Sequence, residues 1–304
     1  MVERTPILDI VSQALLFLGL LASLLPMAAI VIAATHDIYT VNQVPMPLIP
    51  GHDFWKNVTE AWTRADLGPK ILNSMVFAFG VAAGKIFIAA LSAFSIVYFR
   101  YWGKMMVFWL IFITLMLPLE VRIVPTYAVA ANALSPYQTI LDLTGITWLI
   151  HQVTGVQIAL KWGLLNSYTG LILPLIATAT GTFLYRQFFL TLPDELTEAA
   201  RMDGAGAIRF FIDVLIPLSR TNMAALGTVM FVWAWNQYLW PLLVTTDAAH
   251  GTAVTQLKEL IPQHFGIPDW NVAMAGTLIV MLPPLVVVIL MQRWLVRGIV
   301  AAEK

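Results

Sequence analysis

The sequence of 304 residues contains no cysteine, so disulfide bonds and thiolate chemistry are excluded. Charge is also scarce, because only 11% of the residues are charged whereas soluble domains carry roughly 25%. The formal net charge is zero and like charges form no blocks, so nothing points to nucleic-acid binding. What remains is apolar, with 59% hydrophobic residues and a mean hydropathy of +0.80. This composition predicts a polytopic membrane protein.

The motifs of several enzyme classes are missing as well. We find no glycine-rich loop followed by Lys and Ser or Thr, no nucleophile elbow and no His-Glu-x-x-His run. We therefore expect a chain that is not an enzyme, does not hydrolyse ATP and holds no cofactor of its own. The histidines lack the spacing of metal ligands, and we expect no metal site at His36, His52, His151, His250 or His264.

Long apolar runs are present instead. A membrane-spanning helix needs about 20 mainly apolar residues. Six stretches qualify, and we predict spans at 11–34, 71–99, 105–133, 164–185, 221–246 and 271–292. The predicted fold is all-α, with a single transmembrane domain over residues 1–304. Gly80 and Gly84 have the small-xxx-small spacing of a close helix crossing.

Basic residues are unevenly distributed between the connections of these spans. With the N-terminus inside, ten lie on the inner side: Arg4, Arg100, Lys104, Arg186, Arg201, Arg209, Arg220, Arg293, Arg297 and Lys304. Five lie on the outer side: Lys56, Arg64, Lys70, Lys161 and Lys258. Because Lys and Arg accumulate on the cytoplasmic side, both termini and residues 191–220 are predicted to be cytoplasmic.

Two outer connections are long enough to have structure of their own. The first, 36–70, is predicted to contain short surface helices. The second, 132–163, has the length for a seventh span, but Asp142, His151, two Gln and two Gly weaken that interpretation. A span there would also invert the charge asymmetry, so we predict an amphipathic segment on the outer face.

Residues 191–220 are the one long stretch that is both charged and strongly patterned. Asp194, Glu195 and Glu198 suit the positive end of a helix, and Asp-Gly-Ala-Gly at 203–206 is a turn signal. Apolar residues then recur at helical spacing up to Pro217: Ile208, Phe211, Ile212 and Leu215. We predict a helix, a turn and a second helix. The pattern is compatible with insertion into a cleft of a cytoplasmic partner and with a helix pair that lies on lipid headgroups.

The spacing in this stretch resembles the E-A-A loop of ABC-importer permeases. That motif reads E-A-A, three residues, G, nine residues and I-x-L-P, and here it is Glu198-Ala199-Ala200, Gly204 and Val214-Leu215-Ile216-Pro217. The runs 163–174, 183–192 and 235–241 resemble the carbohydrate-uptake branch of these permeases. The resemblance covers most of the chain, and residues 139–160 depart from it.

The resemblance implies a fold with six spans and a set of partners. The chain would be the passive half of a pore in a bacterial inner membrane, beside a second homologous permease subunit. Two cytoplasmic ATPase subunits would bind ATP and Mg, and an extracytoplasmic solute-binding protein would deliver the substrate. The first loop helix would be the coupling helix, which sits in a groove of the ATPase. The coupling residues carried over are Glu195, Glu198, Ala199, Ala200, Asp203, Gly204 and Pro217, with Glu198 making polar contacts and Gly204 the sharp turn.

Ionisable residues at bilayer depth are costly and are functional candidates by default. Glu120 and Arg122 follow Pro118, where a broken helix can line a cavity, and Arg122 suits an anionic substrate because guanidinium grips phosphate with two hydrogen bonds. The alternative is an internal Glu120–Arg122 pair, or partners on the neighbouring subunit. For Lys85, hydrogen bonding between helices is the favoured interpretation.

Aromatic and amide side chains near the end of the fifth span are further candidates. Trp235, Asn236 and Tyr238 combine rings with a polar group and suit a path for a polyol, although Trp and Tyr also gather at membrane interfaces. Within the branch, the resemblance is to permeases for sn-glycerol-3-phosphate and related glycerophosphodiesters or polyol phosphates. A neutral sugar or disaccharide is the alternative. An ion-coupled secondary transporter is more remote, because it predicts more intramembrane acids and an inverted repeat.

Overall fold

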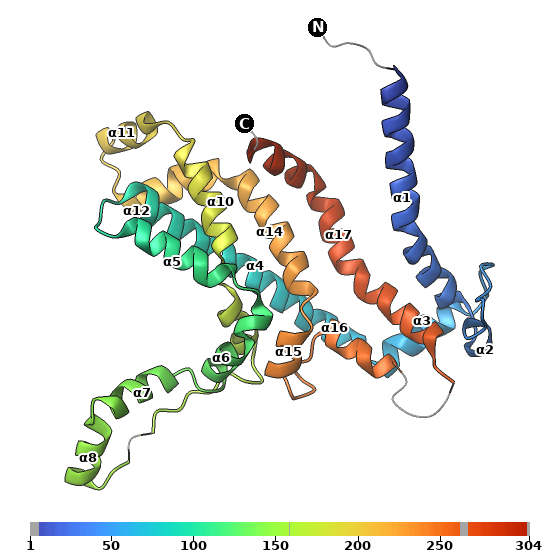
Figure 1. Cartoon of the computed structure of the whole chain (residues 1–304), viewed down its shortest axis with the longest axis horizontal. Helices are drawn as coiled ribbons and strands as arrows, with labels where there is room; N and C mark the ends of the chain where they lie inside the picture. The colour runs from blue at the N-terminus through green and yellow to red at the C-terminus, as the bar shows by residue number, and fades with distance from the viewer. Residues whose placement is uncertain (1–5, 158, 262–266, 303–304) are drawn as a thin grey trace. The chain divides into compact units, whose positions relative to one another are not determined.

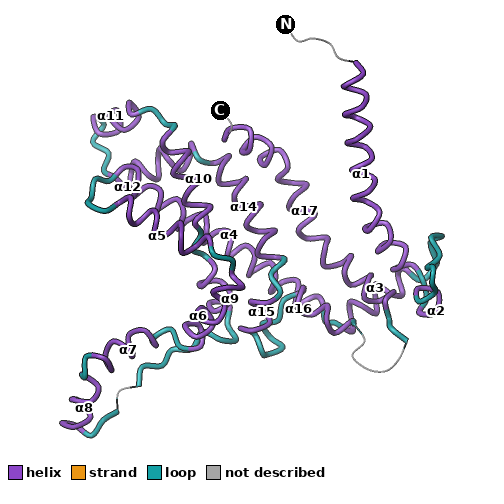
Figure 2. The backbone as a smooth tube through the Cα atoms, in the orientation of Figure 1, coloured by secondary structure: helices purple, strands orange, loops and turns teal. Residues whose placement is uncertain are grey.

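The structure of the chain is a computed structural model that describes residues 6–157, 159–261 and 267–302. Arg4, His264 and Lys304, which entered the sequence analysis, lie outside these residues, and the side chain of Arg297 is not described. Within the described ranges the regular elements are helices and no strand occurs, as Figure 2 shows. The predicted all-α fold is confirmed.

The chain forms two compact units. Their ranges are Met1–Ile71 with Gln256–Leu282 for unit 1, and Leu72–Thr255 with Pro283–Lys304 for unit 2. Two long helices, α4 (Leu67–Tyr98) and α17 (Trp270–Ala302), begin in unit 1 and continue into unit 2. That the whole chain makes a single transmembrane domain stays a prediction.

Unit 1 is held together by a buried amide network. Its other elements are α1 (Pro6–Thr35), α2 (Ile38–Val41), α3 (Phe54–Arg64) and the 3-10 helix η3 (Leu257–Leu260). The Asn57 side chain on α3 donates to the carbonyls of Ala34 and His36, at 2.9 and 2.8 Å. Asn271 at the start of α17 donates to Asn57 Oδ1 at 2.8 Å. The network joins the ends of three helices, and α3 is the surface helix predicted in the first outer connection.

Unit 2 contains the remaining helices. They are α5 (Lys104–Met116), α6 (Leu119–Ala131), α7 (Ser135–Leu143), α8 (Ile146–Thr154), α9 (Tyr168–Ile172), η1 (Leu173–Leu175), α10 (Ala179–Leu190), α11 (Asp194–Met202), α12 (Ala207–Phe210), η2 (Phe211–Leu215), α13 (Ile216–Leu218), α14 (Arg220–Trp235), α15 (Leu239–Val244) and α16 (Ala253–Gln256), whose last residue belongs to unit 1. Figure 1 shows α11 and α12 at one end of unit 2 and α7 and α8 at the other.

Three helices and three bent helix pairs of the described chain are long and apolar enough to cross a membrane. The straight candidates are Ile10–Thr35, Leu67–Tyr98 and Trp270–Leu295. The bent pairs are Lys104–Thr114 with Leu119–Ala131 (102°), Tyr168–Leu175 with Ala179–Leu190 (51°), and Ala207–Leu218 with Arg220–Trp235 (74°). If each bent pair is one span, the total is six, the number expected from the sequence.

The fifth span differs in detail from the predicted 221–246. α14 ends at Trp235, the chain leaves the helix at 236–238, and α15 begins at Leu239. The Asn236 side chain donates to the carbonyl of Val232 at 2.9 Å, so a polar side chain satisfies the last turn of α14. The apolar run therefore contains two helices. Hydropathy counts apolar residues and does not register a helix cap of this kind, so it predicted one continuous span.

Gly80 and Gly84 lie where another segment approaches α4 closely. A Cβ atom at Gly80 would collide with Ile172 of α9, and one at Gly84 would collide with Ile176, which follows η1. The two glycines form a groove for these isoleucines. The small-xxx-small spacing thus marks a real helix crossing.

The connection 132–163 contains no span. Its two helices, α7 and α8, have nine residues each, and each is about 14 Å long. The apolar part of a bilayer is roughly 30 Å thick, so neither helix can cross it. The prediction that no seventh span lies here is confirmed for the described residues, and the location on the outer face stays a prediction.

We predict that Gly84→Val destabilises the fold by about 1–3 kcal/mol, because the new side chain overlaps Ile176 in a packed crossing. Thermal unfolding of the chain in nanodiscs should show a lower midpoint. Gly19→Val is the matched control, since nothing lies within 4 Å of its Cβ position in α1. Equal midpoints for the two variants would contradict the close crossing.

Candidate functional site: a coupling loop and a cationic cluster

The charged stretch forms the predicted helix, turn and second helix. Asp194 and Glu195 lie in the first turn of α11, where negative charge is favourable, and Arg201 lies in its last turn. Pro193 takes the position just before the helix. The sequence alone therefore accounts for both ends of α11.

Gly204 ends α11 in a left-handed turn. Its φ is +72°, a conformation that costs little only for glycine. The Gly204 N–H donates to the Arg201 carbonyl at 3.0 Å, and the Ala205 N–H donates to the Ala200 carbonyl at 2.8 Å. This pair of bonds is the Schellman motif, which satisfies the last carbonyls of a helix. The glycine of the E-A-A pattern is thus explained by backbone geometry.

α11 projects from the other helices of unit 2, and the structure describes no buried residue along it. Of the predicted coupling residues, Ala200 and Pro217 are half-buried and the others are exposed: Glu195, Glu198, Ala199, Asp203 and Gly204. A helix of this kind does not contribute to the core of its own chain. Its side chains are free to contact another protein.

The second helix buries two of the four predicted apolar residues, Phe211 and Leu215, together with Phe210. The other two, Ile208 and Ile212, are 75% and 55% exposed. The reason is aromatic packing. The ring centroids of Phe211 and of Phe94 on α4 are 4.9 Å apart. Large rings bury more apolar area than isoleucine, so they determine which face turns inward.

Pro217 does not end this helix. The Ile216 N–H donates to the Phe211 carbonyl, five residues back, which makes η2 a π-helical turn. Proline has no N–H to continue the normal ladder, and a wider turn is a common accommodation. The helix continues through α13 to Leu218, and the chain bends by 74° before α14.

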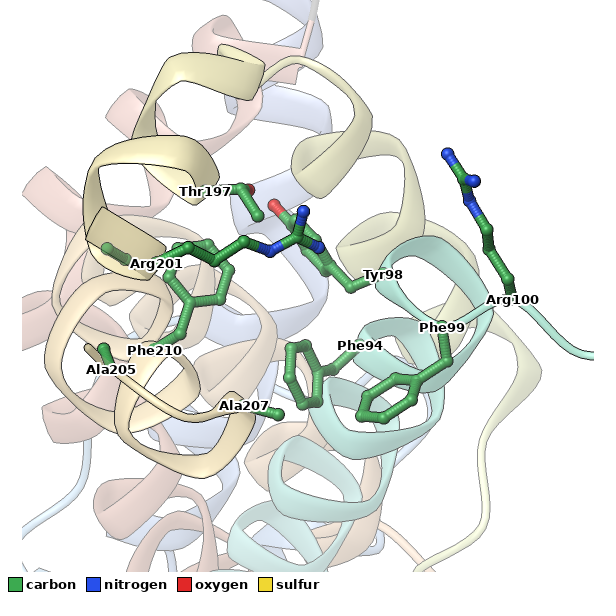
Figure 3. A pocket seen from close by; sticks show the side chains of 10 residues that line it. Phe94, Tyr98, Phe99, Arg100, Thr197, Arg201, Ala205, Ala207 and Phe210 are labelled. Carbon is green, nitrogen blue, oxygen red and sulfur yellow. The ribbon is translucent and has the colours of Figure 1, made fainter. Parts of the chain in front are cut away.

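Aromatic rings connect the coupling loop to the spans. The ring centroid of Tyr98, at the end of α4, lies 5.3 Å from that of Phe210 and 6.0 Å from that of Phe189 of α10. A pocket of about 250 Å³ lies beside them, and Figure 3 shows Arg201 reaching across it toward Tyr98 while Arg100 points away. Ala200 and Ala205 of the turn also line this pocket. A displacement of α11 would reach α4 and α10 through these contacts.

A buried cation lies in the middle of α4. Lys85 is 6% exposed, and its Nζ lies 3.5 Å from the centre of the Trp233 ring and donates to Met230 Sδ at 3.6 Å. Both partners are on α14, so the favoured contact between helices is present. A ring face and a thioether are weak partners that do not neutralise a charge.

Arg122 adds a second positive charge at this place. Its charge is near enough to act on that of Lys85, and its buried Nε has no hydrogen-bond partner among the described residues. Among the described residues, no carboxylate lies within ion-pair distance of Lys85 or Arg122. The internal Glu120–Arg122 pair is not formed, because residues two apart on a helix point to different sides. Glu120 is exposed in the first turn of α6.

The aromatic and amide candidates lie in different environments. Trp235 is 2% exposed and packs on Phe231, with ring centroids 5.8 Å apart. Asn236 and Tyr238 are exposed, and the Asn236 amide caps α14. Trp235 is thus a core residue of unit 2, and only Asn236 and Tyr238 present surface to a path. That the three line a substrate path stays a prediction.

Comparison with known proteins bears directly on these features. The family described as "Binding-protein-dependent transport system inner membrane component" matches residues 85–301, which include both the cationic cluster and the coupling loop. The chain belongs to this family.

Individual relatives agree with that assignment. The sn-glycerol-3-phosphate transport system permease protein UgpE of Yersinia enterocolitica is 46% identical to this permease over 310 residues, and those of Pectobacterium atrosepticum and Escherichia coli O157:H7 are 48% and 46% identical. Each alignment covers 100% of both chains. A bacterial ABC transporter that imports the acidic polysaccharide alginate has the same fold, with a TM-score of 0.69, 20% identity and coverage of 96% of this chain and 98% of that one.

Sequence reasoning identified Lys85 and Arg122 separately but did not pair them. Both were visible as ionisable residues at bilayer depth. Met230 and Trp233 were not predicted as partners of Lys85. Nothing in the order of residues indicates that α14 faces α4 at this level, so only tertiary packing could reveal the cluster in this permease.

We predict that Gly204→Ala loosens the end of α11 by about 1–2 kcal/mol, because a Cβ atom is unfavourable at positive φ. Hydrogen exchange at the amides of Gly204 and Ala205 should become faster. Gly206→Ala is the matched control: it also has open space around its Cβ position, but its φ is −73°. Similar exchange in both variants would contradict the Schellman assignment.

Proposed function

We propose that this permease carries sn-glycerol-3-phosphate, or a related glycerophosphodiester or polyol phosphate, into the cytoplasm as one half of the pore of an ABC importer. Full-length relatives at 46–48% identity bear the name of sn-glycerol-3-phosphate permeases. The single structural observation that supports this substrate is the cationic cluster of Lys85 and Arg122.

The cluster lacks a counter-ion in the described chain. Two positive charges near one another at bilayer depth are unfavourable unless an anion is present for part of the cycle. A phosphate group supplies up to two negative charges and several acceptor oxygens, and guanidinium matches its geometry. Trp233 beside Lys85 adds an apolar surface for a carbon skeleton. A neutral disaccharide would leave both charges uncompensated, so the cluster favours the phosphorylated substrate.

The coupling loop explains how such a permease is driven without hydrolysing ATP itself. The proposed docking site is the exposed face of α11, in a groove of a cytoplasmic ATPase. Glu198 would make polar contacts there, and Gly204 would hold the turn that links α11 to α12. The aromatic contacts of Phe210 with Tyr98 would then carry the motion to α4.

The remaining parts of the assembly follow from the same proposal. The pore would be completed by a second, homologous permease subunit, and two ATPase subunits would bind ATP and Mg. An extracytoplasmic solute-binding protein would deliver the substrate. Both termini and α11 would face the cytoplasm, in agreement with the excess of basic residues on that side.

We predict opposite effects of Lys85→Met on uptake and on stability. Uptake of sn-glycerol-3-phosphate by the complete transporter should fall by about tenfold to hundredfold, the value of one charge-assisted hydrogen bond. The thermal midpoint should rise, because a buried charge without a counter-ion is removed. Uptake of labelled substrate and thermal unfolding of the same preparation measure the two effects.

Arg122→Gln tests the second charge and should also lower uptake. Lys104→Met, at the start of α5, is the matched control and should transport normally. If Lys85→Met and Arg122→Gln both transport the phosphorylated substrate normally, the cluster is not part of its path. A loss of uptake accompanied by a lower midpoint would indicate misfolding instead.

We predict that Glu198→Lys abolishes ATP-driven uptake while the chain still inserts and folds, because the residue is exposed and contacts nothing that the fold requires. Asp213→Lys makes the same charge change in the same loop. It breaks only an exposed Arg209–Asp213 pair at 3.3 Å, which is worth at most about 1 kcal/mol. Normal uptake by Glu198→Lys would contradict the coupling role.

A further inference from the structure

Helices α7 and α8 form a hairpin, residues 135–154, that no other part of the described chain covers. The structure describes no buried residue in either helix. Several of its large apolar side chains are exposed: Tyr137, Ile140, Leu143, Ile146, Trp148, Leu149 and Val153. In Figure 1 the hairpin extends away from the other helices of unit 2. Such a surface needs an occupant.

The apolar side chains of α8 are arranged on one face. Ile146, Leu149 and Val153 recur at helical spacing, and Ile150 completes the stripe. His151 and Gln152 lie on the other side of the helix, with the exposed Trp148 between them, and Thr147 and Thr154 flank the stripe. This is the pattern of a helix that lies with one side in an apolar medium and the other in water.

The hairpin is held in place by a well-ordered neck. Asn132 donates to the Leu160 carbonyl at 3.0 Å, and its Oδ1 accepts the Trp162 N–H at 2.9 Å. Gln138 Oε1 accepts the Leu160 N–H at 2.9 Å. The Ala133 N–H also donates to the Trp162 carbonyl at 2.8 Å. The two chain segments of the neck are therefore tied together, so the hairpin is attached to the rest of unit 2 at a fixed point.

The neck lies between two helices of candidate spans. The connection that contains it runs from the last residue of α6, Ala131, to the first of α9, Tyr168, and both helices belong to bent pairs that are apolar enough to span. If each pair crosses the membrane, the hairpin starts at the boundary between lipid and water. Its helices are too short to re-enter and cross the bilayer.

The side chains of the hairpin suit that boundary. Tyr137 and Trp148 in the hairpin, and Trp162 in the neck, are exposed aromatic residues of the types that gather at headgroup level. The hairpin contains no Lys, Arg or Glu. Its one carboxylate, Asp142, accepts hydrogen bonds from Gln138 and Thr147 at 3.0 and 2.7 Å.

We propose that the hairpin 135–154 lies on the membrane surface opposite the coupling loop, with Leu149 and Val153 of α8 in the lipid and His151 in water. It would fix the corner where the bent pair α5–α6 leaves the membrane. The proposal depends on the membrane location of the chain and not on its substrate.

The absence of cysteine allows a direct test. Leu149→Cys and His151→Cys each introduce one site for a nitroxide label in the full chain, in vesicles of phosphatidylethanolamine and phosphatidylglycerol. Oxygen concentrates in lipid, and a charged or polar nickel chelate stays in water. We expect the label at 149 to collide more with oxygen and the label at 151 more with the chelate. Val153→Cys repeats the lipid-facing measurement with a different side chain lost.

Two results would overturn the proposal. If the labels at 149, 151 and 153 all collide mainly with the nickel chelate, the hairpin stands in water. If the label at 149 becomes shielded from both reagents only when the solute-binding protein and partner subunits are added, the apolar face is a protein-docking surface. Lipid exposure at 149 and 153 that is unchanged in the assembled transporter supports membrane anchoring.

Discussion

Lipid offers the backbone no hydrogen-bond partners, and the way this chain bends its helices depends on that constraint. The breaks in unit 2 are closed by nearby side chains. Thr178 accepts the Gly181 N–H at 3.3 Å before α10, and Ser167 accepts the Gly170 N–H at 3.1 Å before α9. Near Pro217 the backbone itself adapts, through the π-helical turn of η2. At these places the irregular backbone is compatible with a membrane because it carries its own polar compensation.

The cationic cluster does not follow this rule of compensation. In the described part of the chain, the Lys85 ammonium group has a ring face and a sulfur atom as its partners, and Arg122 retains a buried nitrogen without a hydrogen-bond partner. Most buried polar groups in proteins are satisfied, so an exception at bilayer depth points to a transient partner. An anion passing through the pore would be such a partner. The same charges that make the resting fold less stable would thereby select the substrate.

In the coupling loop, an exposed helix and a buried helix have different roles. α11 contributes no buried residue, whereas the helix that follows it packs two phenylalanines against rings of α4. The turn at Gly204 joins these two parts. A partner can therefore bind the exposed helix α11, while the buried helix that follows it transmits the displacement to the spans.

Much of this protein was determined by local sequence. Composition and apolar run length were sufficient for an all-α membrane chain with six candidate spans, and the E-A-A spacing located α11 and its glycine turn, because propensity, capping and hydropathy act over a few residues. Tertiary structure alone decided which faces turn inward. It buried Phe210 and left Ile208 and Ile212 exposed, and it set Lys85 against Met230 and Trp233 of α14. These outcomes depend on contacts between segments far apart in the chain, which periodicity within one helix does not contain.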